Sequence, residues 1–83
     1  GEVLAFVEVK SRSSESWVRP AQAVGRPKQR MLSDTALAYL KELGRPQVAF
    51  RFDIVEVLFA GAEVREVRHI PNAFPLAEGR MYR

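Results

Sequence analysis

Residues 3–10 are the first patterned stretch of the chain, an apolar run in which charged residues appear only at the end. The odd-numbered positions are all apolar, whereas the even-numbered positions begin apolar and end with Glu8 and Lys10. Because successive side chains of a strand point to opposite faces, the pattern predicts a strand covered on both sides. Glu8 and Lys10 then project from one face at the C-terminal end of that strand.

Residues 27–43 have the spacing of an amphipathic helix. Pro27 suits a first helical turn, and Gly44 followed by Pro46 favours an end there. The apolar positions recur every three or four residues and form one stripe: Leu32, Ala36, Tyr39, Leu40 and Leu43. The Ser-rich start of residues 11–26 has no periodicity and indicates a loop.

Two further strands are expected after the helix. Residues 47–59 are rich in aromatic and β-branched side chains, and residues 60–62 form a hairpin turn to a more exposed strand over 63–70, which Pro71 ends. The apolar residues of that last strand are three positions apart, which indicates a β-bulge. Residues 75–83 are expected to be a polar tail.

The element order, strand–helix–strand–strand, predicts an α/β fold with a mixed sheet. The strands at 3–10 and 47–59 should be parallel and joined by a right-handed crossover. The N-terminus of the helix, with Lys28 in its first turn, then lies beside Glu8 and Lys10. Ligands of parallel sheets bind at that end of the strands, and a helix N-terminus suits phosphate.

Composition narrows the class of protein. The 83 residues, 47% hydrophobic and 28% charged, are typical of one small globular domain. The chain has no cysteine, which excludes disulfides and thiolate metal sites. No segment has the length and apolarity of a membrane span or the pattern of a signal peptide, so we expect a cytoplasmic protein. The net charge of +3 permits a polyanionic partner.

Glu8 beside Lys10 suits phosphodiester hydrolysis. Glu8, with the carbonyl of Val9, would ligate Mg²⁺ or Mn²⁺ through oxygen, and the metal would activate a bound water. Lys10 would orient or deprotonate that water, or stabilise charge on the phosphate. One carboxylate is too few for a good Mg²⁺ site, so a second acid is required from a neighbouring strand. The alternative is an ordinary ion pair at a sheet edge.

The segment from Phe6 to Arg12 resembles the Glu-x-Lys half of the PD-(D/E)XK nuclease signature. Over roughly residues 3–74 the chain resembles the bacterial YraN family, also called UPF0102. The matching stretches, in order, are residues 4–12, 20–24, Lys28 with its helix, 51–55 and 69–74. The resemblance implies a restriction-endonuclease-like fold, similar to Holliday-junction resolvases and the transfer-RNA endonuclease catalytic domain. It also implies a metal-dependent nuclease acting on structured or branched DNA, with RNA not excluded.

The family's Gly-Glu-Ile-Asp strand has no counterpart in this chain. Gly1-Glu2 is followed by Val3-Leu4, so no aspartate stands there, and Glu2 is too close to Glu8 for an intervening hairpin. We therefore expect residues 1–74 to be the C-terminal part of one domain whose N-terminal part is missing. Mg²⁺ is not expected to bind without that aspartate, and this chain alone is expected to be inactive. The alternatives are a non-catalytic nucleic-acid-binding protein and a protein-interaction domain.

The remaining candidates each have a functional and a structural interpretation. Arg12, Arg26 and Lys28 are expected to contact phosphate, or else to be solvated surface. Trp17 beside Arg19 suits base stacking, or packing of the loop. Asp53 is expected to pair with an arginine, and His69 to be structural or at the surface. The open edge of a partial sheet predicts self-association, as a homodimer through sheet continuation.

Overall fold

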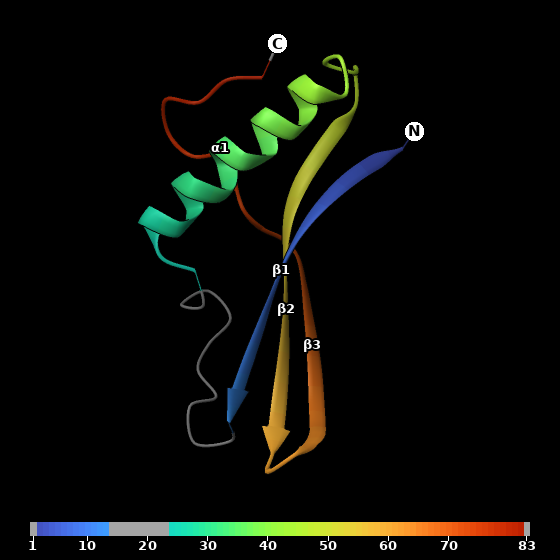
Figure 1. Ribbon diagram of the computed structural model, residues 1–83, viewed down its shortest axis with the longest axis vertical. Coiled ribbons are helices and arrows are strands. Elements are labelled where there is room, and N and C mark those ends of the chain that lie inside the picture. Colours follow the sequence, from blue (N-terminus) through green and yellow to red (C-terminus); the bar gives the residue numbers. More distant parts are fainter. Residues whose placement is uncertain (1, 14–23, 83) are drawn as a thin grey trace.

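The computed structural model describes residues 2–13 and 24–82, which form three strands and one helix (Figure 1). In chain order these are β1 (Val3–Ser13), α1 (Arg26–Glu42), β2 (Ala49–Ala60) and β3 (Glu63–Phe74). The sheet has the order β1-β2-β3, with β1 parallel to β2 and β2 antiparallel to β3. The predicted mixed sheet and its β-α-β-β order are therefore confirmed. β1 continues three residues beyond the predicted end at Lys10.

α1 covers only one of the two faces of the sheet (Figure 1). We call the covered side the inner face and the opposite side the outer face. The even-numbered residues of β1 and β2 lie on the inner face, and the odd-numbered residues lie on the outer face. Val3, Val7 and Val9 are each more than half exposed on the outer face. The prediction that β1 is buried on both sides is therefore wrong, because no described element packs on its outer side.

The core lies between α1 and the inner face of the sheet. Its buried members come from the residues before α1, from α1 itself, from β2 and from the end of β3: Val24, Ala36, Phe52, Ile54 and Phe74. Phe52 and Phe74 stack with ring centroids 4.9 Å apart, and Phe6 of β1 contacts Phe52 at 5.8 Å. This aromatic cluster fixes β1, β2 and the end of β3 relative to one another.

α1 begins and ends close to the predicted positions. Pro27 lies in its first turn, and Gly44 follows its end with a φ of 84°, a conformation that suits glycine. The predicted stripe is only half buried, because Ala36 and Leu40 are buried whereas Tyr39 and Leu43 are about half exposed.

β3 contains two irregularities. The pairing with β2 shifts between Leu58 and Phe59, which confirms the bulge predicted from the spacing of the valines. A second shift lies between Phe52 and Ile54, opposite residues 71–73, where Asn72 has a φ of 51°. The prediction that Pro71 ends the strand is wrong, since β3 passes through this second bulge and re-pairs at Phe74. A proline is tolerated there because β3 is an edge strand.

Residues 75–82 pack against α1 rather than extending from the body as the expected polar tail. The backbone N–H of Ala77 donates to the hydroxyl of Ser33, which is completely buried in α1. Further along, Arg80 pairs with Asp34 of α1 at 3.0 Å. The hydroxyl of Tyr82 donates to the carbonyl of Pro46, beyond the end of α1. Each contact is between residues far apart in sequence, which is why local patterning does not reveal them.

Within the part of the chain that the structure describes, no helix is both long and apolar enough to cross a membrane.

Candidate functional site

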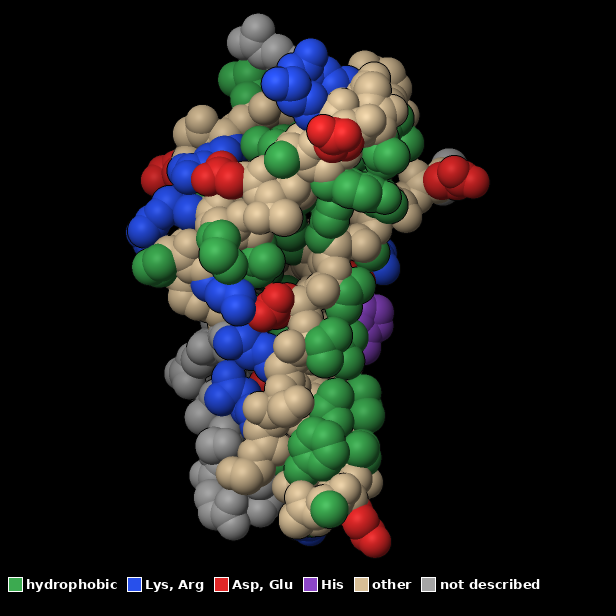
Figure 2. Space-filling model, viewed as in Figure 1, with side chains coloured by type: hydrophobic (Ala, Val, Ile, Leu, Met, Phe, Trp, Pro, Cys, Tyr) green, Lys and Arg blue, Asp and Glu red, His purple; other side chains and the backbone are tan. Residues whose placement is uncertain are grey.

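The C-terminal half of β1 presents three charged side chains on the inner face of the sheet, beyond the part that α1 covers. Glu8, Lys10 and Arg12 alternate with outward-facing residues and are each partly buried. Because β1 and β2 are parallel, the connecting helix begins near this end of the strands. Figure 2 shows Lys and Arg side chains gathered here, below the N-terminal end of α1 and along β1.

Glu8 pairs with Lys28 of the first turn of α1, Nζ lying 2.9 Å from Oε1. The sequence-based placement of Lys28 beside Glu8 is therefore confirmed. The Glu8 side chain is 20% exposed and that of Lys28 41% exposed. Because both can exchange with water, the pair contributes little to stability. Both groups are accessible to a ligand.

Lys10 shares a face with Glu8 but is not its partner. Its register partner across the sheet is Glu56 of β2, so Lys10 has an acid on its own strand, Glu8, and another on the next strand, Glu56. Among residues 2–13 and 24–82, no salt bridge of Lys10 is found within 4 Å. Lys10 is therefore the cation of this site that a ligand can recruit without breaking an ion pair.

Glu56 is a charged residue that sequence reasoning missed. Its side chain is completely buried, and its Oε2 accepts a hydrogen bond of 2.9 Å from Nε of Arg12. Its other oxygen, Oε1, is buried with no hydrogen-bond partner among the described residues. The signal was present in the alternation of β2, because Glu56 continues the inward-facing series of Phe50, Phe52 and Ile54.

A second charged cluster lies around Asp53 on the outer face. Oδ1 of Asp53 accepts from the backbone N–H of Asn72 at 2.9 Å and lies 3.0 Å from Nε of Arg51. Oδ2 lies 2.9 Å from Nε2 of His69. Burial alone raises the pKa of Asp53, but Asn72, His69 and Arg51 outweigh it, so the pKa lies below the usual range. The expected pairing of Asp53 with an arginine is confirmed.

The Asp53 cluster supports the fold rather than the inner-face site. Asp53 is 2% exposed and holds the backbone of Asn72, which has a positive φ in the second bulge of β3. His69 reaches Asp53 from β3 with a half-exposed ring, in agreement with a structural or surface role.

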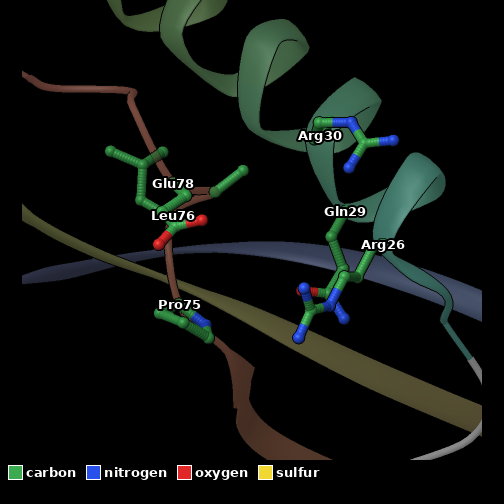
Figure 3. Close-up of a pocket in the computed structure, with 7 residues that line it drawn as sticks. Arg26, Gln29, Arg30, Pro75, Leu76 and Glu78 are labelled. Atoms are coloured by element: carbon green, nitrogen blue, oxygen red, sulfur yellow. The ribbon is translucent and has the colours of Figure 1, made fainter.

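Arg26 lies apart from the other predicted phosphate-binding residues. It lines a cavity of about 460 Å³ between the first turns of α1 and the C-terminal segment, together with Arg30 and Glu78 (Figure 3). The nitrogen of Gln29 at this cavity donates to the carbonyl of Val24. The structure therefore brings Lys28 of α1 beside Glu8 on β1, the strand that also carries Lys10 and Arg12 on the same face, whereas Arg26 faces the C-terminal segment. Trp17 and Arg19 lie outside the described residues.

The acidic residues of the site do not by themselves fit a divalent metal. Within the described ranges, no group of three or more His, Cys, Asp or Glu residues could hold a metal ion. Mg²⁺ requires several oxygen ligands, whereas Glu8 is paired with Lys28 and Glu56 with Arg12. Val9 turns its side chain to the outer face, and the role of its carbonyl as a ligand stays a prediction.

Comparison with known proteins gives consistent matches. The sequence model of the uncharacterised protein family UPF0102 matches residues 2–57. The UPF0102 protein of Geobacter metallireducens is 40% identical over 77 residues, covering 93% of this chain and 62% of the relative. That of Alkaliphilus metalliredigens is 42% identical over 74 residues, covering 89% and 63%. That of Chlorobaculum tepidum is 37% identical over 83 residues, covering 94% and 64%. No solved structure matches.

Proposed function

We propose that this chain, which belongs to the UPF0102 family, binds the sugar-phosphate backbone of nucleic acid. DNA is the nucleic acid that we expect it to bind. The binding surface is the inner face of β1 together with the first turn of α1. Cleavage of structured or branched DNA is proposed for a longer protein, since the chain spans about three fifths of the length of the curated relatives that it matches.

The observation that carries the proposal is the excess of cations over accessible carboxylates on this surface. Lys10, Arg12 and Lys28 lie there, and Glu8 is the one acid of the group with an exposed fraction, since Glu56 is completely buried. A phosphate can compete with Glu8 for Lys28, because the Lys28 side chain is 41% exposed and its pair with Glu8 is open to water on that side. Lysine and arginine contacts to phosphate supply most sequence-independent affinity for nucleic acid.

Catalysis is proposed only with a second acid from outside this chain. Glu8 would then act as a metal ligand and Lys10 as the catalytic lysine, with Mg²⁺ or Mn²⁺ as the metal. Because the described residues do not fit such an ion, no cleavage step follows from their geometry. In this chain Lys10 and Lys28 bind phosphate, and Glu8 holds Lys28 over the strand.

A non-catalytic nucleic-acid-binding protein is the second candidate, and one observation favours it. The carboxylate that a metal would need is already engaged by Lys28 at 2.9 Å. If this pair persists in the longer protein, Glu8 serves to position a phosphate-binding lysine, and the surface binds without cutting.

Binding by this chain can be measured by fluorescence anisotropy with fluorescein-labelled junction, flap, single-stranded and duplex DNA at several salt concentrations. Lys28→Ala should weaken binding and make its salt dependence shallower. The negative slope of log affinity against log salt should shrink in magnitude by about 0.9 on duplex DNA, the value for one phosphate contact. The matched control is Lys41→Ala, which removes an exposed lysine from the last turn of the same helix. Absence of binding at low salt, or equal losses in both variants, would contradict the proposal.

Cleavage requires a separate experiment on the longer protein with Mg²⁺ or Mn²⁺. The unmodified protein should cut branched substrates, whereas Glu8→Gln and Lys10→Ala should bind them without cutting. If all three behave alike, the catalytic assignment is wrong. Salt-dependent binding without cleavage by the unmodified protein would establish the second candidate.

A further inference from the structure

Glu56 is a buried acid surrounded by basic side chains on a surface proposed to bind a polyanion. Its cross-strand neighbours are Lys10 on β1 and Arg68 on β3, and its Oε2 accepts from Nε of Arg12. Lys10, Glu56 and Arg68 are side by side on the three strands. Arg12 reaches Glu56 from two positions further along β1. Glu56 is not among the predicted site residues, and it lies outside the five matching stretches that carry the family resemblance.

Burying Glu56 in this way is energetically unfavourable for the fold alone. A carboxylate taken out of water must recover its lost hydration from protein hydrogen bonds, yet Oε1 of Glu56 is buried without one. Apolar residues of similar volume often stabilise a fold as well as a buried ion pair does. A buried acid with an unpaired oxygen requires an explanation other than stability, and one explanation is that it positions the side chains bound to it.

The geometry shows what Glu56 holds. It engages Arg12 through Nε, the inner nitrogen of the guanidinium group. The two terminal nitrogens keep four N–H donors, and no described residue accepts from them. Arg12 is 20% exposed, so the outer end of its planar group remains available to a phosphate. The negative charge of Glu56 also favours a position of the Lys10 ammonium over β2.

We propose that Glu56 is a positioning residue for backbone binding. It orders Arg12 and Lys10 into a second phosphate subsite, further along β1 from the subsite of Lys28. The proposal rests on the proposed function and adds to it that successive phosphates of one strand follow β1. Glu56 does not touch the nucleic acid, and it acts through Arg12 and Lys10.

The sign of one mutation separates positioning from simple electrostatics. Glu56→Gln removes a negative charge beneath a polyanion site, so charge alone predicts tighter binding to DNA. A positioning role predicts the opposite. Gln retains the size of Glu but holds Arg12 through a weaker hydrogen bond, because the acceptor no longer carries a charge, so DNA affinity should fall, by up to roughly tenfold.

The experiment compares three proteins of this chain on fluorescein-labelled DNA: the unmodified chain, Glu56→Gln and Glu63→Gln. Glu63 is an exposed acid on β3 whose register partner is Ala60, so Glu63→Gln makes the same change in charge away from Lys10, Arg12 and Arg68. Glu63→Gln should bind slightly tighter and Glu56→Gln more weakly. NMR of the Arg12 Nε–H group should show slow exchange with water in the unmodified chain and fast exchange in Glu56→Gln.

The outcomes separate this proposal from the proposed function. Failure of the unmodified chain to bind DNA overturns both. Binding by the unmodified chain, with Glu56→Gln binding equally well or tighter, overturns the positioning role alone. Unchanged exchange of the Arg12 Nε–H group in a folded Glu56→Gln variant also overturns it. Weaker binding together with faster exchange supports it.

Discussion

Replacement of Asp53 by asparagine should destabilise the fold far more than the same change at another acid of the chain. Asp53 is 2% exposed and is hydrogen-bonded to His69 and to the backbone N–H of Asn72, which belongs to the second bulge of β3. It is also ion-paired with Arg51. Asparagine has nearly the same shape, but it has no charge and only one oxygen. One oxygen cannot accept from Asn72 on one side and His69 on the other.

The expected loss in the free energy of unfolding follows from the exposure of the partners. The side chains of Arg51 and His69 are 39% and 52% exposed, so their pairing with Asp53 contributes little after solvent screening. Asparagine can still accept from the Asn72 N–H, so the loss there is the difference between a hydrogen bond to a charged group and one to a neutral group, about 1–1.5 kcal/mol. A domain of this size has roughly 4–12 kcal/mol in total.

Urea denaturation followed by far-UV circular dichroism measures the loss, and acid denaturation tests its cause. The pKa of Asp53 is lowered in the folded state, so its contribution is complete above the ordinary carboxyl pKa of about 4 and is lost as pH falls through the lower folded-state pKa. Asp53→Asn should therefore lose less stability than the unmodified chain as pH falls through this range.

Asp34→Asn is the matched control. Asp34 is also paired with an arginine, Arg80, which lowers its pKa by hydrogen bonding, but it is exposed on α1. The reasoning is refuted if Asp53→Asn is as stable as the unmodified chain, or if the two variants lose equal stability.

Two further predictions concern the core and the outer face. Phe52→Ala should lower the free energy of unfolding by about 3–5 kcal/mol in urea denaturation. Phe52 is 3% exposed and contacts the rings of Phe6, Phe50 and Phe74. Tyr39 is about half exposed, and an equal loss in Tyr39→Ala would show that this cluster is not the core. Within the described residues no strand pairs with the other edge of β1, and this edge and the exposed valines predict self-association of this chain. Val9→Lys should reduce self-association in sedimentation experiments while changing stability by no more than about 0.5 kcal/mol. A monomeric unmodified chain would contradict this prediction.

The sequence by itself determined the helix and strands, their order, and the position of Lys28 beside Glu8. Periodicity is a local property, so alternation and three-to-four-residue spacing were enough to place α1 and the three strands within a few residues. A helix that joins two parallel strands begins near the C-terminal end of the first strand, which placed Lys28 beside Glu8 without knowledge of any contact, and the ion pair at 2.9 Å confirms it. The same alternation already placed Glu56 on the inner face, although its significance depends on burial.

Only the tertiary structure decided how the charges pair and which face is covered. Glu8 and Lys10 are two residues apart, which indicated that they act together on one ligand. In the structure Glu8 pairs with Lys28 of α1, and the register partner of Lys10 is Glu56 of β2. Pairing depends on distances between side chains from different elements, which the sequence does not contain. For the same reason the apolar outer positions of β1 did not reveal that they are exposed. Val3–Ser13 is a strand because of its local pattern, but its inner face became a candidate site only when α1 and β2 packed beside it.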